Sequence, residues 1–207
     1  MKVFMLGGSG QTGQILLKGL VNKGIEVTAF VRDSSKVKQI NGKLKVVQGD
    51  PANAESIQKY LVGHDAVVST LGYRKLKQPE RVFQPAIQAI VDVGPQVGIK
   101  KIVYLSAYGV AESRNDARFI LRRVFLPMLL EGVFADHEAT EKIIRSSGID
   151  YTIVRPGMLN NGSRTGSYRA EEGFMKAMKI SRADVADFML RSLTDTSFSK
   201  KTVGLSY

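Results

Sequence analysis

The first 13 residues read MKVFMLGGSGQTG, and this stretch decides the fold. An apolar strand predicted at 2–6 leads directly into Gly7, Gly10 and Gly13, and apolar residues at helical spacing follow. Glycines allow a tight strand-to-helix turn and let phosphate oxygens approach bare backbone. The stretch therefore predicts a strand, a pyrophosphate-binding turn and a helix, in the order that opens a dinucleotide-binding fold.

The predicted helix begins with N–H groups that can hold an anion. Their residues face the turn with the positive end of the helix dipole behind them. The candidate cofactor-binding residues of this turn are Gly7, Ser9, Gly10, Gln11, Thr12 and Gly13. The alternative is a glycine-rich turn that binds no ligand.

The end of the second predicted strand, 26–31, favours one cofactor over another. In a dinucleotide-binding fold this end meets the adenosine ribose, about 20 residues past the glycines. Arg32 offers a planar set of donors there, with Ser35 and Lys36 beside it, and these groups suit a 2′-phosphate. The sequence thus predicts NADP(H) in preference to NAD(H). The alternative is a solvated turn in which Asp33 pairs with Arg32 or Lys36.

Length and composition favour one compact unit. The chain has 207 residues, of which 43% are hydrophobic, enough for one core. We predict a single domain over 1–207, with small substrate-side segments at about 107–135 and 158–180. The absence of cysteine excludes disulfides, thiolate nucleophiles and thiolate metal sites, and fits a reducing cytoplasm. No metal site is predicted. The most apolar stretch, 119–133, carries two arginines and a proline, so no membrane span is predicted.

The charge of the chain is strongly basic. Thirty Lys and Arg residues against 19 Asp and Glu give a formal charge of +11. The basic residues are spread along the chain and form no stripe interleaved with aromatic residues, so nucleic-acid binding is not favoured. Attraction of an anionic cofactor and substrate is a sufficient reason for the charge.

Predicted strands and helices alternate along the whole sequence. Strands are predicted at 2–6, 26–31, 45–48, 66–70, 101–105, 151–154 and about 202–205. Helices are predicted after the glycine turn, at 54–62, at about 81–97, in a long region that leads through His137 to Ser147, and at about 182–193. This alternation is typical of the α/β class with a single doubly wound parallel sheet, a Rossmann fold with helices on both faces.

Ligands of such sheets bind outside the carboxyl ends of the strands, which defines further candidates. Asp50 can accept from an adenine amino group, or it is a turn residue before Pro51. The residues predicted to line the middle of the cofactor are Ser69, Thr70, Leu71 and Gly72. Those predicted to close over the nicotinamide are Pro156, Gly157 and Met158.

Ser106 follows the fifth predicted strand and is a candidate catalytic residue. At that strand end its hydroxyl would lie near the nicotinamide or the substrate. The alternative is a serine that only caps backbone groups.

Several segments together resemble one superfamily, the atypical short-chain dehydrogenase/reductases. They are GGSGQTG at 7–13, VRDSS at 31–35, GD at 49–50, VYLSA at 103–107, DH at 136–137 and EKIIRSSGIDYTIVRPG at 141–157. Within it the chain is most similar to the small NAD(P)H-binding proteins related to biliverdin-IXβ reductase/flavin reductase. The resemblance implies a single Rossmann domain that reduces flavins, linear tetrapyrroles or quinones with NADPH. It also implies functional positions at the glycines, Arg32, Ser106 and His137.

The chain departs from ordinary short-chain dehydrogenases at their Tyr-x-x-x-Lys pair. Counting back from Glu141, the matching positions are Val133 and His137, so the tyrosine acid is missing. His137 would hold the ribose or donate a proton near neutral pH. Alternatively it is a surface residue paired with Glu141 across one helical turn. His64, in the loop before the fourth strand, is predicted to be solvated.

These features predict hydride transfer from bound NADPH to a conjugated acceptor, a flavin, quinone or linear tetrapyrrole that spreads the charge it gains. The acceptor is expected to be planar and anionic, and the protein to be a monomer or homodimer. A non-catalytic NADP(H) sensor that acts through a protein partner is the main alternative, and an epimerase of sugar nucleotides is a further one. Candidate walls for the acceptor are 73–81, 108–134 and 158–168, and candidate anion-binding residues are Arg114, Arg118 and Arg122.

Overall fold

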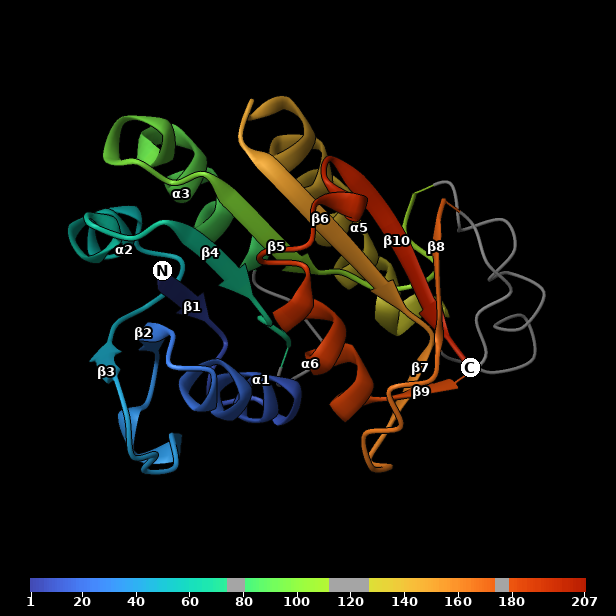
Figure 1. Cartoon of the computed structure of the whole chain (residues 1–207). Coiled ribbons are helices and arrows are strands. Elements are labelled where there is room, and N and C mark those ends of the chain that lie inside the picture. The colour runs from blue at the N-terminus through green and yellow to red at the C-terminus, as the bar shows by residue number, and fades with distance from the viewer. Residues whose placement is uncertain (74–80, 112–126, 174–178) are drawn as a thin grey trace.

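The computed structural model describes residues 1–73, 81–111, 127–173 and 179–207, and of 127–130 only the backbone. Within these residues an eight-stranded sheet has the order β3-β2-β1-β4-β5-β6-β10-β8 (Figure 1). The strands are β1 (Lys2–Leu6), β2 (Glu26–Val31), β3 (Leu44–Gln48), β4 (Ala66–Ser69), β5 (Lys101–Leu105), β6 (Asp150–Pro156), β8 (Arg169–Glu172) and β10 (Lys201–Ser206). All pairings are parallel except that of β8 with β10. A separate parallel pair joins β7 (Met158–Asn160) and β9 (Lys179–Ser181).

Helices cover both faces of the sheet. On one face lie α1 (Gln11–Asn22) and α6 (Arg182–Arg191), which pack against each other. On the other lie α2 (Ala54–Leu61), α3 (Phe83–Val97) and α5 (Pro127–Ser146), as Figure 1 shows. Short 3₁₀ turns, η1 (Ser34–Lys36) and η3 (Thr196–Phe198), follow β2 and precede β10. The predicted doubly wound parallel sheet is therefore confirmed.

Each face of the sheet has its own apolar core. Val3 and Met5 point toward α1 and α6, whereas Phe4 and Leu6 point toward α2 and α3. Side chains alternate across a strand, so a strand buried on both faces reads as a continuous apolar run. This is why the sequence of β1 is apolar from Val3 to Leu6 without a polar break.

Predicted boundaries differ from the observed ones by a few residues, and three short strands were missed. The run that becomes β8, Arg-Ala-Glu-Glu, is polar because it lies at the sheet edge and pairs only with β10. Both prolines of α3 are accommodated. Pro85 is its third residue, where no intrahelical N–H bond is needed, and Pro95 precedes the left-handed Gly98 that ends the helix.

The parallel register brings the carboxyl ends of β2, β1, β4, β5 and β6 to one edge of the sheet. Residues that follow these strands therefore meet along that edge. No helix in the described ranges is long and apolar enough to cross a bilayer. In the same ranges no three potential metal ligands gather.

Candidate functional site

A crevice of about 540 Å³ lies along the carboxyl edge of the sheet. It is lined by Gly7, Ser9, Gly10, Gln11, Thr12, Phe30, Val31, Arg32, Asp33, Lys36, Pro51, Thr70, Leu71, Gly72, Tyr73, Leu105, Ser106, Ala107, His137, Leu159 and Arg182. One crevice thus brings together the glycine turn, the tip of β2, the segment after β4, and Ser106 with His137.

Two glycines of the turn are needed for close packing of the chain itself. Gly7 has φ +79°, and a Cβ there would lie 2.5 Å from the Thr70 carbonyl carbon. A Cβ on Gly13 would lie 2.1 Å from the Gly7 oxygen. A Cβ on Gly10 would instead meet only the Gly7 oxygen, at 3.4 Å. Because Gly10 lines the crevice, its missing side chain leaves space there for a ligand.

The start of α1 presents free N–H groups to this space. Its N-cap is Gly10, which has no side-chain oxygen to accept from them. The N–H groups of Gln11, Thr12 and Gly13 have no hydrogen-bond partner within the part of the chain that the structure describes. By contrast, Asn53 caps α2 and Ser181 caps α6. Uncapped N–H groups at a helix start suit a phosphate.

Three charged residues lie together after β2, and two of them, Asp33 and Lys36, pair with each other and not with Arg32. Lys36 pairs with Asp33 at 2.7 Å, and this hydrogen bond lowers the pKa of the Asp33 carboxyl to about 2. Ser35 also donates its hydroxyl to Asp33, at 2.6 Å, and it does not line the crevice. Among the described residues Arg32 has no ion-pair partner. The predicted Asp33 pairing therefore exists with Lys36, and it leaves the Arg32 guanidinium available to a ligand.

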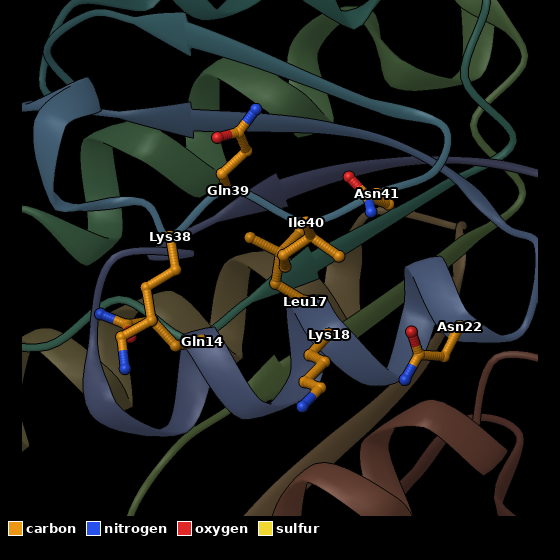
Figure 2. Close-up of a pocket in the computed structure, with 8 residues that line it drawn as sticks. All are labelled: Gln14, Leu17, Lys18, Asn22, Lys38, Gln39, Ile40 and Asn41. Atoms are coloured by element: carbon orange, nitrogen blue, oxygen red, sulfur yellow. The ribbon is translucent and has the colours of Figure 1, made fainter.

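Gln14 connects the glycine turn to the segment after β2. Its amide donates to the Ser9 carbonyl at 3.1 Å and to the Lys36 carbonyl at 3.3 Å. Gln14 also lines a second hollow of about 350 Å³, shown in Figure 2 between α1 and residues 38–41, with Leu17 and Ile40 at its centre. This hollow lies outside the crevice, and its lining holds no carboxylate, histidine or hydroxyl group.

Ser106 is held by a buried ionic network. Its hydroxyl donates to Glu141 Oε1 at 2.7 Å. Arg155 at the end of β6 donates to both Glu141 oxygens, from Nε at 3.0 Å and from an η nitrogen at 2.6 Å. Arg145 adds a bond of 3.1 Å to Oε2. The predicted alternative for Ser106, a backbone cap, is therefore wrong.

His137 lies in the crevice but is a buried, neutral ring. Burial lowers its pKa to about 3, so no imidazolium forms near neutral pH. Its Nδ1 lies 2.7 Å from the Tyr104 hydroxyl, and its ring stacks on Phe83 at 4.3 Å. This environment therefore disfavours an imidazolium, and with it proton donation by His137 near neutral pH. The alternative of a surface pair with Glu141 is also wrong, because His137 is buried and Glu141 binds Ser106 and two arginines.

Asp136, next to His137, joins three elements. Its carboxylate accepts from the N–H groups of Val82, Phe83 and Gln84 at 3.0–3.1 Å, and so caps α3. It also accepts from the hydroxyl of Tyr73, a residue of the crevice wall. Burial and this hydrogen bond raise the Tyr73 pKa above its usual value.

Several predicted cofactor residues do not line the crevice. Asp50 is exposed and its carboxylate accepts from the Ala52 N–H at 2.9 Å, as the turn alternative predicted. Ser69 is buried, and its hydroxyl has no partner among the described residues. The residues at the junction of β6 and β7, Pro156, Gly157 and Met158, are also absent from the lining.

His64 is not solvated as predicted. Its ring is half-buried, with Nε2 2.8 Å from the Thr28 hydroxyl and Nδ1 3.0 Å from the Leu61 carbonyl. It also makes an edge contact with Phe4. Because its polar neighbour Thr28 lies on β2, this contact depends on strand pairing and is not visible in the local sequence.

Three further described crevice residues, none of them predicted singly as a site residue, lie far apart in the chain. They are Tyr73, Leu159 and Arg182, whose guanidinium also donates to Asn161 at 2.8 Å. Tyr73 and Leu159 lie in the predicted acceptor walls 73–81 and 158–168, whereas no signal in the sequence marked Arg182. Residues 74–80 of the first wall, and the predicted anion-binding residues Arg114, Arg118 and Arg122, lie outside the described residues.

Comparison with known proteins identifies the family of this chain. The profile of a family described as NAD(P)H-binding matches residues 7–196. The chain belongs to this NAD(P)H-binding family, as its resemblance predicted.

Particular relatives support the family and the fold. An uncharacterized chloroplastic protein of Arabidopsis thaliana is 33% identical over 98% of this chain and 75% of its own. A Bacillus subtilis protein called an uncharacterized sugar epimerase is 27% identical over 100% of this chain and 94% of its own. Among solved structures, the anaerobilin reductase ChuY of Escherichia coli O157:H7 has a TM-score of 0.85 at 19% identity, over 100% of this chain and 97% of its own. That likeness shows a common fold.

Proposed function

We propose that this protein is an NADPH-dependent reductase of a conjugated acceptor. The observation that carries the proposal is that one crevice joins the uncapped start of α1, the available Arg32 guanidinium and the Ser106 hydroxyl. A phosphate cradle at one end and side chains for a second ligand at the other are what such a reductase requires.

The described residues fit NADP(H) at both phosphate positions. The free N–H groups at the start of α1 would hold the pyrophosphate, and Gly10 leaves room for it. Arg32 would pair with the 2′-phosphate, which NAD(H) lacks. Thr70 lines the crevice, and its hydroxyl lies 3.2 Å from both the Leu6 and the Gly7 carbonyl oxygens, which share its one hydrogen. Bound NADPH supplies a hydride from its nicotinamide.

The chemistry of the β5 end of the crevice favours an acceptor that needs no strong acid. His137 is neutral there, and the Tyr73 proton is committed to Asp136. Val133 is buried in the core at the position where ordinary short-chain dehydrogenases carry their tyrosine. An alkoxide product would require a proton from such a group. A flavin, quinone or linear tetrapyrrole delocalises the charge it gains and takes its proton from water.

The acceptor is proposed to be planar and anionic. Arg182 lines the crevice near Leu159, beyond Ser106 along the sheet edge, and offers a guanidinium to a carboxylate or phosphate. We propose that the segments around residues 107–135 and 158–180 complete this side of the site. The predicted location in the cytoplasm stays a prediction, and one relative is chloroplastic by name.

A sensor that binds NADP(H) without catalysis is the second candidate, because the described crevice holds no side chain poised to release a proton near neutral pH. Epimerization is less well supported. One relative is named as a sugar epimerase, but Val133 replaces the tyrosine on which that chemistry ordinarily depends.

The test is the loss of NADPH absorbance with purified protein and a panel of FMN, riboflavin, a benzoquinone and biliverdin, repeated with NADH. Turnover of any of these with NADPH, and weaker turnover with NADH, is the expected result. No turnover, together with tight NADP⁺ binding by calorimetry, would support the sensor instead. Loss of both turnover and binding would contradict both candidates.

A further inference from the structure

The hydroxyl of Ser106 has a fixed direction. A hydroxyl has one hydrogen, and that of Ser106 is directed at Glu141 Oε1, 2.7 Å away. The serine lines the crevice with only 5% of its surface exposed. What remains for a ligand at this point is the pair of acceptor sites on Oγ.

Glu141 keeps the hydroxyl in this direction. Its side chain is 2% exposed and that of Arg155 is 1% exposed, and the two form a bidentate pair. A carboxylate between two arginines has only acceptor oxygens, so Ser106 must donate to it. Turning the Ser106 proton toward the crevice would remove one hydrogen bond from a buried carboxylate, which is unfavourable.

We propose that Ser106 is a hydrogen-bond acceptor toward the bound ligands, and that the site therefore selects an N–H group at this position over a carbonyl oxygen. Glu141 and Arg155 are positioning residues that fix this polarity. The inference rests on the proposed reductase function. The N–H has two possible sources, the carboxamide of the nicotinamide ring and a ring N–H of the acceptor, such as that of a flavin or a pyrrole.

Whether Ser106 donates or accepts a hydrogen bond affects which class of acceptor molecule the site binds. A serine that donates its proton would favour the carbonyl oxygen of a ketone or quinone. A serine that can only accept leaves such an oxygen facing the lone pairs of Oγ, without a hydrogen bond. Quinones would then bind less well at this point than flavins or linear tetrapyrroles, which carry N–H groups.

Two pairs of probes separate the two sources. The cofactor pair is NADP⁺ and its 3-acetylpyridine analogue, which keeps the carbonyl but lacks the amide N–H. The acceptor pair is lumiflavin and 3-methyllumiflavin, which differ at the ring N–H. Binding of the first pair is measured by calorimetry, and binding of the second by quenching of flavin fluorescence with NADP⁺ present.

At least one pair is expected to show about tenfold tighter binding of the N–H form, equivalent to about 1.4 kcal/mol. This preference should disappear in Ser106→Ala. It should remain in Ser192→Ala, a control that loses a buried hydroxyl bonded to the Phe188 carbonyl, outside the crevice lining. Equal binding within both pairs, or a preference that survives in Ser106→Ala, would overturn the inference.

Glu141→Gln tests the positioning role. An amide can turn its NH₂ group toward Ser106, which frees the serine proton for the crevice. The preference should then shift toward the carbonyl-only probes, a change that simple loosening of the site would not produce. If this variant does not fold, the Ser106→Ala comparison decides alone. The cofactor pair requires no turnover, so the inference is tested even if every acceptor of the reductase assay is rejected.

Discussion

At the scale of single residues, Arg32 is the residue that we propose distinguishes NADP(H) from NAD(H). Its guanidinium lines the crevice without an ion-pair partner among the described residues, while the nearby Lys36 is paired with Asp33. Arg32→Ala should weaken NADPH binding by roughly tenfold to a hundredfold, because a charge-assisted bond contributes about 1.5–3 kcal/mol. NADH binding should change little. Calorimetry with both cofactors measures the difference.

Lys38→Ala is the matched control for this prediction. Lys38 carries the same charge on the same segment but lines the hollow of Figure 2, outside the crevice. It should leave the preference for NADPH almost unchanged. If Lys38→Ala and Arg32→Ala reduce NADPH binding equally, the preference arises from net charge and not from a contact with Arg32.

The positions of single residues were easier to predict than their contacts. Ser106 was placed correctly at the crevice because it follows a strand, and all residues after parallel strands meet at one edge. The direction of its proton depends on Glu141, 35 residues further on, and on Arg155. Likewise, nothing local to His137 shows that Tyr104 and Phe83 bury its ring. Contacts between distant segments set both pKa values and hydrogen-bond polarity.

At the scale of elements, helix α1 depends on close approach of its first turn to β1. A Cβ on Gly13 would lie 2.1 Å from the Gly7 oxygen, which is backbone and cannot move aside. Gly13→Ala should therefore lower the free energy of unfolding by about 2 kcal/mol and abolish NADPH binding. Chemical denaturation and calorimetry measure the two effects.

Gly19→Ala is the control within the same helix. A Cβ at Gly19 would contact only Leu190 Cδ2, at 3.4 Å, the end of a flexible side chain. Because alanine favours helix by about 1 kcal/mol over glycine, this variant should be as stable as the wild type or more stable, and should bind NADPH normally. Destabilisation by both variants to the same degree would mean that helix position, and not contact with Gly7, explains the result.

Helix α3 is anchored by a residue from another helix. Asp136 of α5 accepts from three N–H groups at the start of α3 and from Tyr73. Asp136→Ala should lower the free energy of unfolding by on the order of 3 kcal/mol, since several buried donors lose their acceptor. Asn53→Ala removes an exposed local cap of α2 and should cost only about 1 kcal/mol. Equal losses in denaturant titrations would contradict the anchoring role of Asp136.

At the scale of the whole molecule, the sequence predicted the alternating strands and helices of the parallel sheet but not the short strands β7, β8 and β9. The alternation of apolar strands and helices gives the parallel sheet, because two-sided burial makes each inner strand apolar. The polar edge strand β8 and the short pair of β7 with β9 have no such pattern. Leu159 was included only as part of the predicted acceptor wall 158–168, and Arg182 could not be assigned to the crevice before these pieces were placed.

The same burial that organises the site links the stability of the fold to pH. Burial lowers the His137 pKa from 6.5 to about 3, so between these values the unfolded chain binds a proton that the folded chain does not. The contribution of His137 to the free energy of unfolding is complete above the unfolded-state pKa of 6.5. It falls by about 1.4 kcal/mol per pH unit below that value. Asp33 and Asp184, whose carboxyl pKa values are lowered to about 2, lose their contributions only in more acidic solution.

Denaturant titrations at about pH 7.5 and about pH 5.5 isolate this effect, because only a group that titrates near 6.5 when unfolded contributes there. The wild type should lose about 1.4 kcal/mol more across this interval than His137→Gln, whose neutral amide binds no proton in either state. Only the difference between the two pH values is compared, so any constant cost of the substitution cancels. If both proteins lose the same amount, the buried ring accepts a proton in the folded state. His137 would then be available as an imidazolium, and an acceptor that needs an acid from the protein could be reduced at this site.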